Sequence, residues 1–329
     1  HYVMAKGEEN ARLATANAYL KALDKVSDRE TKAFIIRQLQ LLGKDECVDT
    51  LASYLNDENL SGPAARALSA IRTDNAKKVL VASLMRRSGT PKTQKDIIRA
   101  IADVQIADAE NVLKAMLGSS DENMQKEVLY ALSRVGSKAS LSDLAAVAEK
   151  AGYKMEKTGA NEAYIALIKR VLEQGDTKDA EKAANDLLKK STKAGMTQTR
   201  EAALQILLAA KPEAATKNLL SALKDTDKGY RNAALNFASG FADQNVYIEV
   251  MKHMLKAKPE VKVDILNWIG RESKCPSKHD MIKNLELRFD LPAKQVLLEQ
   301  LKDKNFDVQQ AAVWLKSVIR VSFLCWLIC

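Results

Sequence analysis

The side chains that could perform acid–base chemistry or bind a metal are few and widely spaced in this chain of 329 residues. Histidine, the usual proton-transfer group near neutral pH, occurs only at His1, His253 and His279. Cys275 and His279 have a CxxxH spacing that could place two metal ligands on one side of a helix. Pro276 opposes a helix there and no further Cys or His follows at ligand spacing, so we expect no metal site.

Other patterns that carry chemistry are incomplete or missing. Asp303-x-Asn305-x-Asp307 resembles the start of a calcium-binding EF-hand loop. Val308 stands where that loop needs a glycine, and Trp314 where it needs a bidentate glutamate, so we interpret the acids as helix caps. The sequence has no CxxC pair, Walker loop, GxSxG motif or HExxH motif. We therefore predict no catalytic residue and no cofactor, and hence no enzyme.

The charges form the pattern of solvent-exposed amphipathic helices. Lys and Arg together number 51 and Asp and Glu 42, which gives a net charge of +9. Opposite charges alternate at helical spacing, as in residues 178–190. The basic clusters lack the interleaved aromatic residues that single-stranded nucleic acid binding usually needs. The pattern disfavours nucleic acid as the partner.

The composition predicts an all-α protein, because Gly (13), Pro (6) and aromatic residues (5%) are too sparse for a sheet protein. A five-residue pattern of two small or apolar residues, two variable residues and a large apolar residue recurs along the chain. We call the last residue of each copy the closing residue; the closing residues are at 39, 68, 101, 132, 168, 206, 237, 268 and 315. A second apolar-periodic run follows most copies. This period predicts an α-solenoid of about nine helical hairpins.

Turn residues support these boundaries. Short polar side chains precede the first helix of several hairpins and can accept its unpaired N–H groups; they lie in 56–59, 119–123, 225–227 and 303–307. Ser27 with Glu30 has the spacing of a capping box, and Ser61 stands just before Pro63, so both serines are predicted caps. We also expect a longer link at 152–160 and an additional short helix within 271–292.

Two stretches carry the resemblance to a known family. Asp225-x-Asp227-x-x-Tyr230-Arg231-x-Ala233-Ala234-x-x-Phe237 looks like the signature of HEAT repeats, and residues 303–315 repeat it. The likeness extends over about residues 27–320. It implies an armadillo-like superhelix that forms one elongated domain, residues 1–320, followed by an apolar tail at 321–329. We expect the tail to reflect truncation, an artificial end or docking onto another subunit.

A second resemblance concerns the setting of the repeats. The chain is similar to the HEAT regions of large exported bacterial proteins, which sit beside a sugar-directed catalytic domain. That resemblance implies an exported or periplasmic location, whereas without it a cytoplasmic location is expected. The longest apolar run, Val313–Cys329, is broken by Lys316 and Arg320 and leaves nine uninterrupted residues, too few to span a bilayer.

Three functions follow from these patterns. The first is a non-catalytic scaffold that binds a protein partner, since repeats occur without a catalytic cluster. The second is the helical accessory region of a larger carbohydrate-active enzyme, with a carbohydrate-related partner or a fused catalytic domain. The third is a nucleic-acid-binding protein of the alkylation-glycosylase type, for which Trp268, Trp314 and Trp326 are candidates. For Trp268 and Trp314 we favour packing in the core-facing slots of first helices.

The candidate binding surface is the concave face, which we expect the second helices to form. Aligning those helices places one row of residues on one face; the row consists of Lys78, Asn111, Lys182, Lys217 and Lys252. A turn later the aligned residues are mostly small, among them Ser221, which predicts a groove. Four lysines suit an anionic or polyhydroxylated partner. Lys32, Arg66 and Arg231 are expected on the opposite, outer helices.

Overall fold

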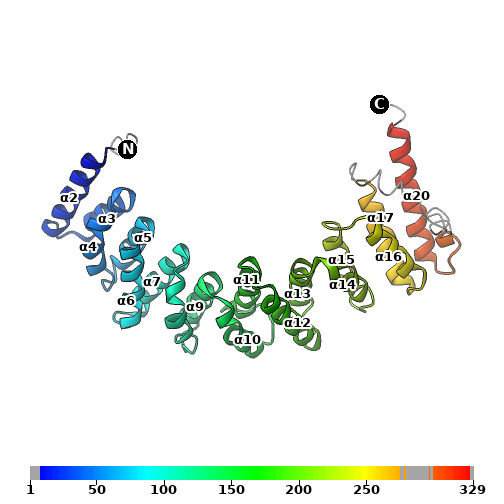
Figure 1. Cartoon of the computed structure of the whole chain (residues 1–329), viewed down its shortest axis with the longest axis horizontal. Coiled ribbons are helices and arrows are strands. Elements are labelled where there is room, and N and C mark those ends of the chain that lie inside the picture. Colours follow the sequence, from blue (N-terminus) through cyan, green and yellow to red (C-terminus); the bar gives the residue numbers. More distant parts are fainter. Residues whose placement is uncertain (1–7, 275–277, 279–295, 297–298, 327–329) are drawn as a thin grey trace. The chain divides into compact units, whose positions relative to one another are not determined.

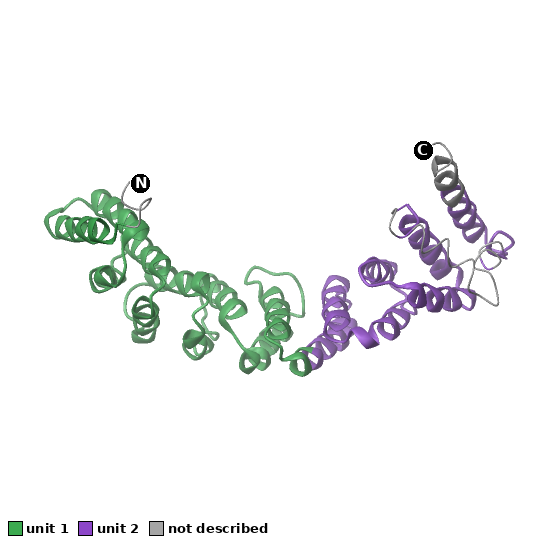
Figure 2. Ribbon diagram, turned by 45° about the horizontal axis from the view of Figure 1, so that its top comes forward, with its two compact units in different colours: residues 1–180 green, residues 181–329 purple. Residues whose placement is uncertain are grey.

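The computed structural model describes residues 8–274, 278, 296 and 299–326. These residues form helices joined by short turns, with no strand among them. The chain divides into two compact units, His1–Ala180 and Glu181–Cys329, and the boundary falls inside α12 (Thr177–Ala194) (Figure 2). The all-α solenoid predicted from the sequence is confirmed.

Unit 1 is a series of helical hairpins (Figure 1). It opens with α2 (Glu9–Lys25), and its first helices are α3 (Arg29–Leu42), α5 (Ser61–Ile71), α7 (Pro91–Val104), α9 (Glu122–Val135) and α11 (Ala160–Glu173). The second helices are α4 (Val48–Ser53), α6 (Asp74–Arg86), α8 (Glu110–Lys114) and α10 (Leu141–Lys150). Short 3-10 turns lead into α4, α8 and α10; they are η1 (Asp45–Cys47), η2 (Ala107–Ala109) and η3 (Lys138–Ser140). Each first helix packs on the next one.

Unit 2 continues the pattern. Its first helices are α13 (Thr197–Ala210), α15 (Lys228–Ala238), α17 (Pro259–Glu272) and α20 (Phe306–Trp326), each packed on the next. Its second helices are α14 (Ala215–Ala222), which follows η4 (Pro212–Ala214), and α16 (Gln244–Leu255). The additional helix expected within 271–292 falls almost entirely outside the described residues.

The closing residues form the core as predicted. All except Phe237 are buried; Phe237 is half-buried against the same core. The second small residue of each alanine pair is also buried: Ala65, Ala203, Ala234 and Ala312 are each at most 4% exposed. A methyl group at this position lets the next first helix approach closely, whereas a larger side chain would force the helices apart.

Helix caps agree with the sequence at most turns. Asp121 accepts a hydrogen bond from the backbone N–H of Asn123 (2.9 Å), and Asp227 accepts one from Tyr230 (3.2 Å). Asn305 caps α20 through the N–H of Val308 (3.2 Å).

Two predicted caps are wrong. Asp28, not Ser27, caps α3: its carboxylate accepts bonds from the hydroxyl and the N–H of Thr31, and these bonds lower the Asp28 pKa. Ser61 is buried inside α5, where its hydroxyl donates to Asp96 of α7 (2.7 Å). At the first site the carboxylate of Asp28 takes the capping role in place of Ser27. At the second site the Ser61 hydroxyl binds a partner in the next repeat and does not cap.

The longer link predicted before the fifth hairpin is present between α10 and α11. Its Glu156 carboxylate accepts hydrogen bonds from the backbone N–H groups of Thr158 (2.7 Å) and Ala160 (3.0 Å). The link therefore supplies its own cap for the first turn of α11.

A buried ion pair joins two first helices of unit 2. The Arg231 Nε and Nη2 atoms of α15 each lie 2.7 Å from Asp264 Oδ2 of α17, and both side chains are 3% exposed. Arg231 also donates to the backbone carbonyls of Asp225 and Thr226, each at 3.0 Å. The expectation that Arg231 lies on an outer surface is therefore wrong, because a carboxylate on the next helix draws the guanidinium inward.

The same repeat position carries a similar bond in the neighbouring hairpins. Six residues before the closing residue, Arg200 pairs with the carboxylate of Asp225, and Lys262 Nζ lies 2.6 Å from Asp303 Oδ2. Each bond fixes the turn or helix of the following repeat against the first helix before it.

We expect Ala234→Leu to lower the free energy of unfolding of unit 2 by about 1–3 kcal/mol, because the added atoms enter a filled contact between first helices. The midpoint of urea denaturation measures this. Ala209→Leu is the control, since Ala209 is exposed on α13 of the same unit. An unchanged midpoint for Ala234→Leu would contradict the close-contact role of this position.

Removing one partner of the buried ion pair should be more damaging than removing both. We expect Asp264→Ala to lower the free energy of unfolding by about 3–5 kcal/mol, since it leaves a buried guanidinium without its carboxylate. The double variant Arg231→Met with Asp264→Leu should recover part of that loss. Both are measured by urea denaturation, with exposed Asp307→Ala as the control. Equal stability of Asp264→Ala and the parent chain contradicts the proposed role of the pair.

Candidate binding surfaces

The five residues of the predicted row all lie exposed on second helices or on α12. Lys78 is on α6, Asn111 on α8, Lys182 on α12, Lys217 on α14 and Lys252 on α16. α14 and α16 are in contact, so the structure brings the helices of Lys217 and Lys252 together. Lys252 Nζ bonds to Glu249 Oε1 of its own helix at 2.8 Å. The binding role of the row stays a prediction.

A polar hollow of about 290 Å³ lies beside part of this row in unit 2. Polar side chains of α12 and α14 line it, namely Asn185, Thr192, Asn218 and Ser221. The lining also includes Arg200, Asp225 and Tyr230. The Arg200 guanidinium lies 4.1 Å from the centre of the Tyr230 ring, and burial raises the Tyr230 pKa to about 12. Lys182 precedes Asn185 by one helical turn and Lys217 precedes Ser221 by one turn, so both lysines share a face with lining residues. Ser221 lines this hollow, and the groove along the whole row of small residues stays a prediction.

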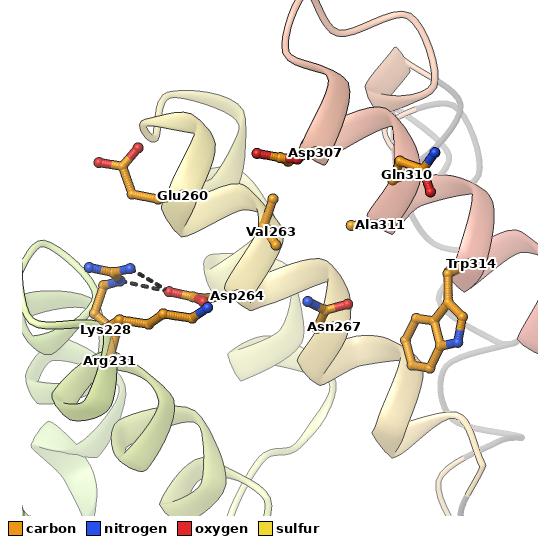
Figure 3. A pocket seen from close by; sticks show the side chains of 10 residues that line it. All are labelled: Lys228, Arg231, Glu260, Val263, Asp264, Asn267, Asp307, Gln310, Ala311 and Trp314. Atoms are coloured by element: carbon orange, nitrogen blue, oxygen red, sulfur yellow. Dashed lines mark hydrogen bonds and ion pairs between the residues drawn. The ribbon is translucent and has the colours of Figure 1, made fainter.

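A second hollow, of about 470 Å³, crosses α15, α17 and α20 (Figure 3). The pair of Arg231 and Asp264 lies on one side of it and Trp314 on the other. Trp314 is half-buried and packs against the core next to the closing residue Leu315, which agrees with the packing role predicted for it. Its ring lies against Gly270, where a Cβ atom would be 2.1 Å from Trp314 Cζ3.

Trp268 has the packing role predicted for it. It is fully buried and stacks on Tyr247 with a centroid distance of 4.9 Å, and its Nε1 donates to Ser239 Oγ at 3.0 Å. The side chain of Trp326 lies outside the described part of the chain. The tryptophans of described structure therefore form no common aromatic site.

A third hollow, of about 530 Å³, lies between α9 and α11 in unit 1 and was missed from the sequence. It is lined by the cationic side chains Lys126, Arg134, Lys169 and Arg170, the carboxylates Glu162 and Glu173, and Tyr130 among others. A signal was present, since Arg134 and Arg170 each stand two residues after a closing residue. We call this hollow the α9–α11 groove.

The potentially reactive groups that the structure describes are held in packing roles. Burial and the nearby Glu46 charge raise the pKa of the Cys47 thiol to about 11, which disfavours the reactive thiolate. Burial and Lys224 lower the pKa of His253. The pair Cys275 and His279 lies outside the described residues. None of the helices in the described ranges has the length and apolarity needed to cross a membrane.

Comparisons with known proteins find one family model and several solved structures that are similar to this chain. Residues 82–165 match the family model of HEAT repeats. Among solved structures, an engineered protein aligns with 93% of this chain and 98% of its own length, at 18% identity and a TM-score of 0.39. Importin beta aligns with 92% of this chain and 47% of its own length, at 14% identity and a TM-score of 0.48, so the chain spans about half of it. No curated protein matches the sequence significantly.

The matched segment runs from α6 into α11, and the hairpins on either side of it repeat the same alternation of first and second helices. The chain is a helical solenoid in which residues 82–165 match HEAT repeats.

Proposed function

We propose that the chain is a non-catalytic scaffold that binds a protein partner along the row of Lys78, Asn111, Lys182, Lys217 and Lys252. The observation that supports this most directly is the exposure of all five side chains, each on a second helix or on α12. Exposed charges that repeat along a solenoid suit an extended partner, since each hairpin adds one contact.

The polar hollow between α12 and α14 favours a second candidate. Amide, hydroxyl and guanidinium groups line it, and such groups hydrogen-bond polyhydroxylated ligands. The corresponding function is that of a helical accessory region of a larger carbohydrate-active enzyme. That candidate requires a gene that continues into a catalytic domain, so a gene without one argues against it.

Charge reversal tests the row. Replacing Lys78, Lys217 and Lys252 by Glu together should reduce recovery of a cross-linked partner by about tenfold, because three contacts that each contribute a fraction of a kcal/mol are inverted. Quantitative mass spectrometry of the captured proteins, compared with the parent chain, measures this.

The matched control reverses Arg37, Arg66 and Arg271, which are exposed on first helices. Arg231 is unsuitable because it is buried, and Lys32 because it is half-buried beside Tyr54. Equal loss of partner in both triple variants, or in neither, contradicts the row. Binding that instead weakens steeply with salt and follows added DNA points to the nucleic-acid alternative.

A further inference from the structure

The α9–α11 groove has cationic side chains on both walls. Lys126 and Arg134 come from α9, and Lys169 and Arg170 come from α11. With Glu162 and Glu173 as the carboxylates of its lining, cations outnumber anions by four to two. The groove therefore favours a ligand that carries negative charge at separate points.

Both arginines are held in place by the preceding first helix. Arg134 Nε donates to the backbone carbonyl of Ala102, and Arg170 Nε donates to that of Gly136, each at 3.1 Å. These carbonyls lie at the C-terminal ends of α7 and α9. Among the described residues neither terminal nitrogen of Arg134 has a hydrogen-bond partner. A fixed guanidinium with unoccupied N–H groups is preorganised for a carboxylate, because little side-chain freedom is lost on binding.

Gln105 supports Arg170 from the end of α7. Its Oε1 accepts a hydrogen bond from Arg170 Nη1 at 3.3 Å, although it stands at the C-cap of α7 with φ of 57°. That left-handed conformation favours glycine over glutamine. The Gln105 side chain holds one terminal nitrogen of Arg170 at the groove.

The lining also includes an exposed aromatic ring and two small side chains. Tyr130 is 46% exposed, and the Arg134 guanidinium lies 5.9 Å from its ring centre. Ala163 and Ala166 line the groove from the α11 side. Aromatic rings next to arginine are typical anchors for peptide side chains.

We propose that the α9–α11 groove binds an acidic peptide segment, with carboxylates on Arg134 and Arg170 and an apolar side chain on Tyr130. A peptide fits better than a nucleic acid because Glu162 and Glu173 repel a continuous phosphate backbone. A peptide also brings N–H donors, whose hydrogen bonds the carboxylates of the lining can accept. This surface is separate from the lysine row, so the two proposals can fail independently.

Fluorescence anisotropy with the full chain and a labelled peptide tests the proposal. The probe is a peptide of about ten residues that alternates Glu with Phe and Gly; its counterpart carries Gln in place of Glu. We expect the acidic peptide to bind at least tenfold more tightly than the Gln peptide. Equal affinities overturn the proposal, as does tighter binding of single-stranded DNA of equal charge.

Four variants localise the binding. Lys126→Glu and Tyr130→Ala should each weaken binding several-fold, while Lys150→Glu, an exposed lysine of α10, should not. Gln105→Gly is the most specific test, because glycine adopts the left-handed conformation without strain and lacks the side-chain amide that holds Arg170. We expect it to keep or raise the thermal midpoint and yet weaken peptide binding. Unchanged binding in Gln105→Gly and Tyr130→Ala overturns the assignment, and so does equal weakening by Lys150→Glu.

Discussion

The close approach of successive first helices is the constraint on which the remaining structure depends. Each first helix must lie against the next, and a methyl side chain at Ala65, Ala203, Ala234 and Ala312 permits it. Burial of the closing residues then follows, since they fill the space on the inner side of the same contact. Every hairpin touches mainly its neighbours, so stability is a sum of local terms in which each interface counts separately.

That constraint explains which parts of the fold could be predicted from the sequence. Pattern and spacing identify residues that face the core, such as Leu68 or Trp268, because a 3.6-residue period determines which side of a helix faces inward. Arg231 was misplaced because its partner, Asp264, comes from the next repeat and replaces a small residue there. Ser27 lost its capping role to Asp28 because two good caps stand side by side.

The binding surfaces also differ in whether a local pattern or several repeats determine them. Exposure of the lysine row follows from helix periodicity alone. The α9–α11 groove depends on contributions from three successive first helices, since Gln105 lies at the end of α7. No single stretch of sequence contains that information, although the matching places of Arg134 and Arg170 record part of it. Sites assembled from several repeats are hidden from pattern analysis because each repeat supplies only one or two side chains.

The self-capped link between α10 and α11 has a consequence for how such an array can change over time. Glu156 satisfies the N–H groups of its own loop, and Met155 beside it is 71% exposed. Extra residues inserted at Met155 should disturb little packing, because Lys154 and Met155 are both exposed. Thr158 and Gly159 border the α9–α11 groove, so a lengthened loop would hang at its rim. New ligand specificity could therefore evolve by loop growth at this point while the stacked helices stay unaltered.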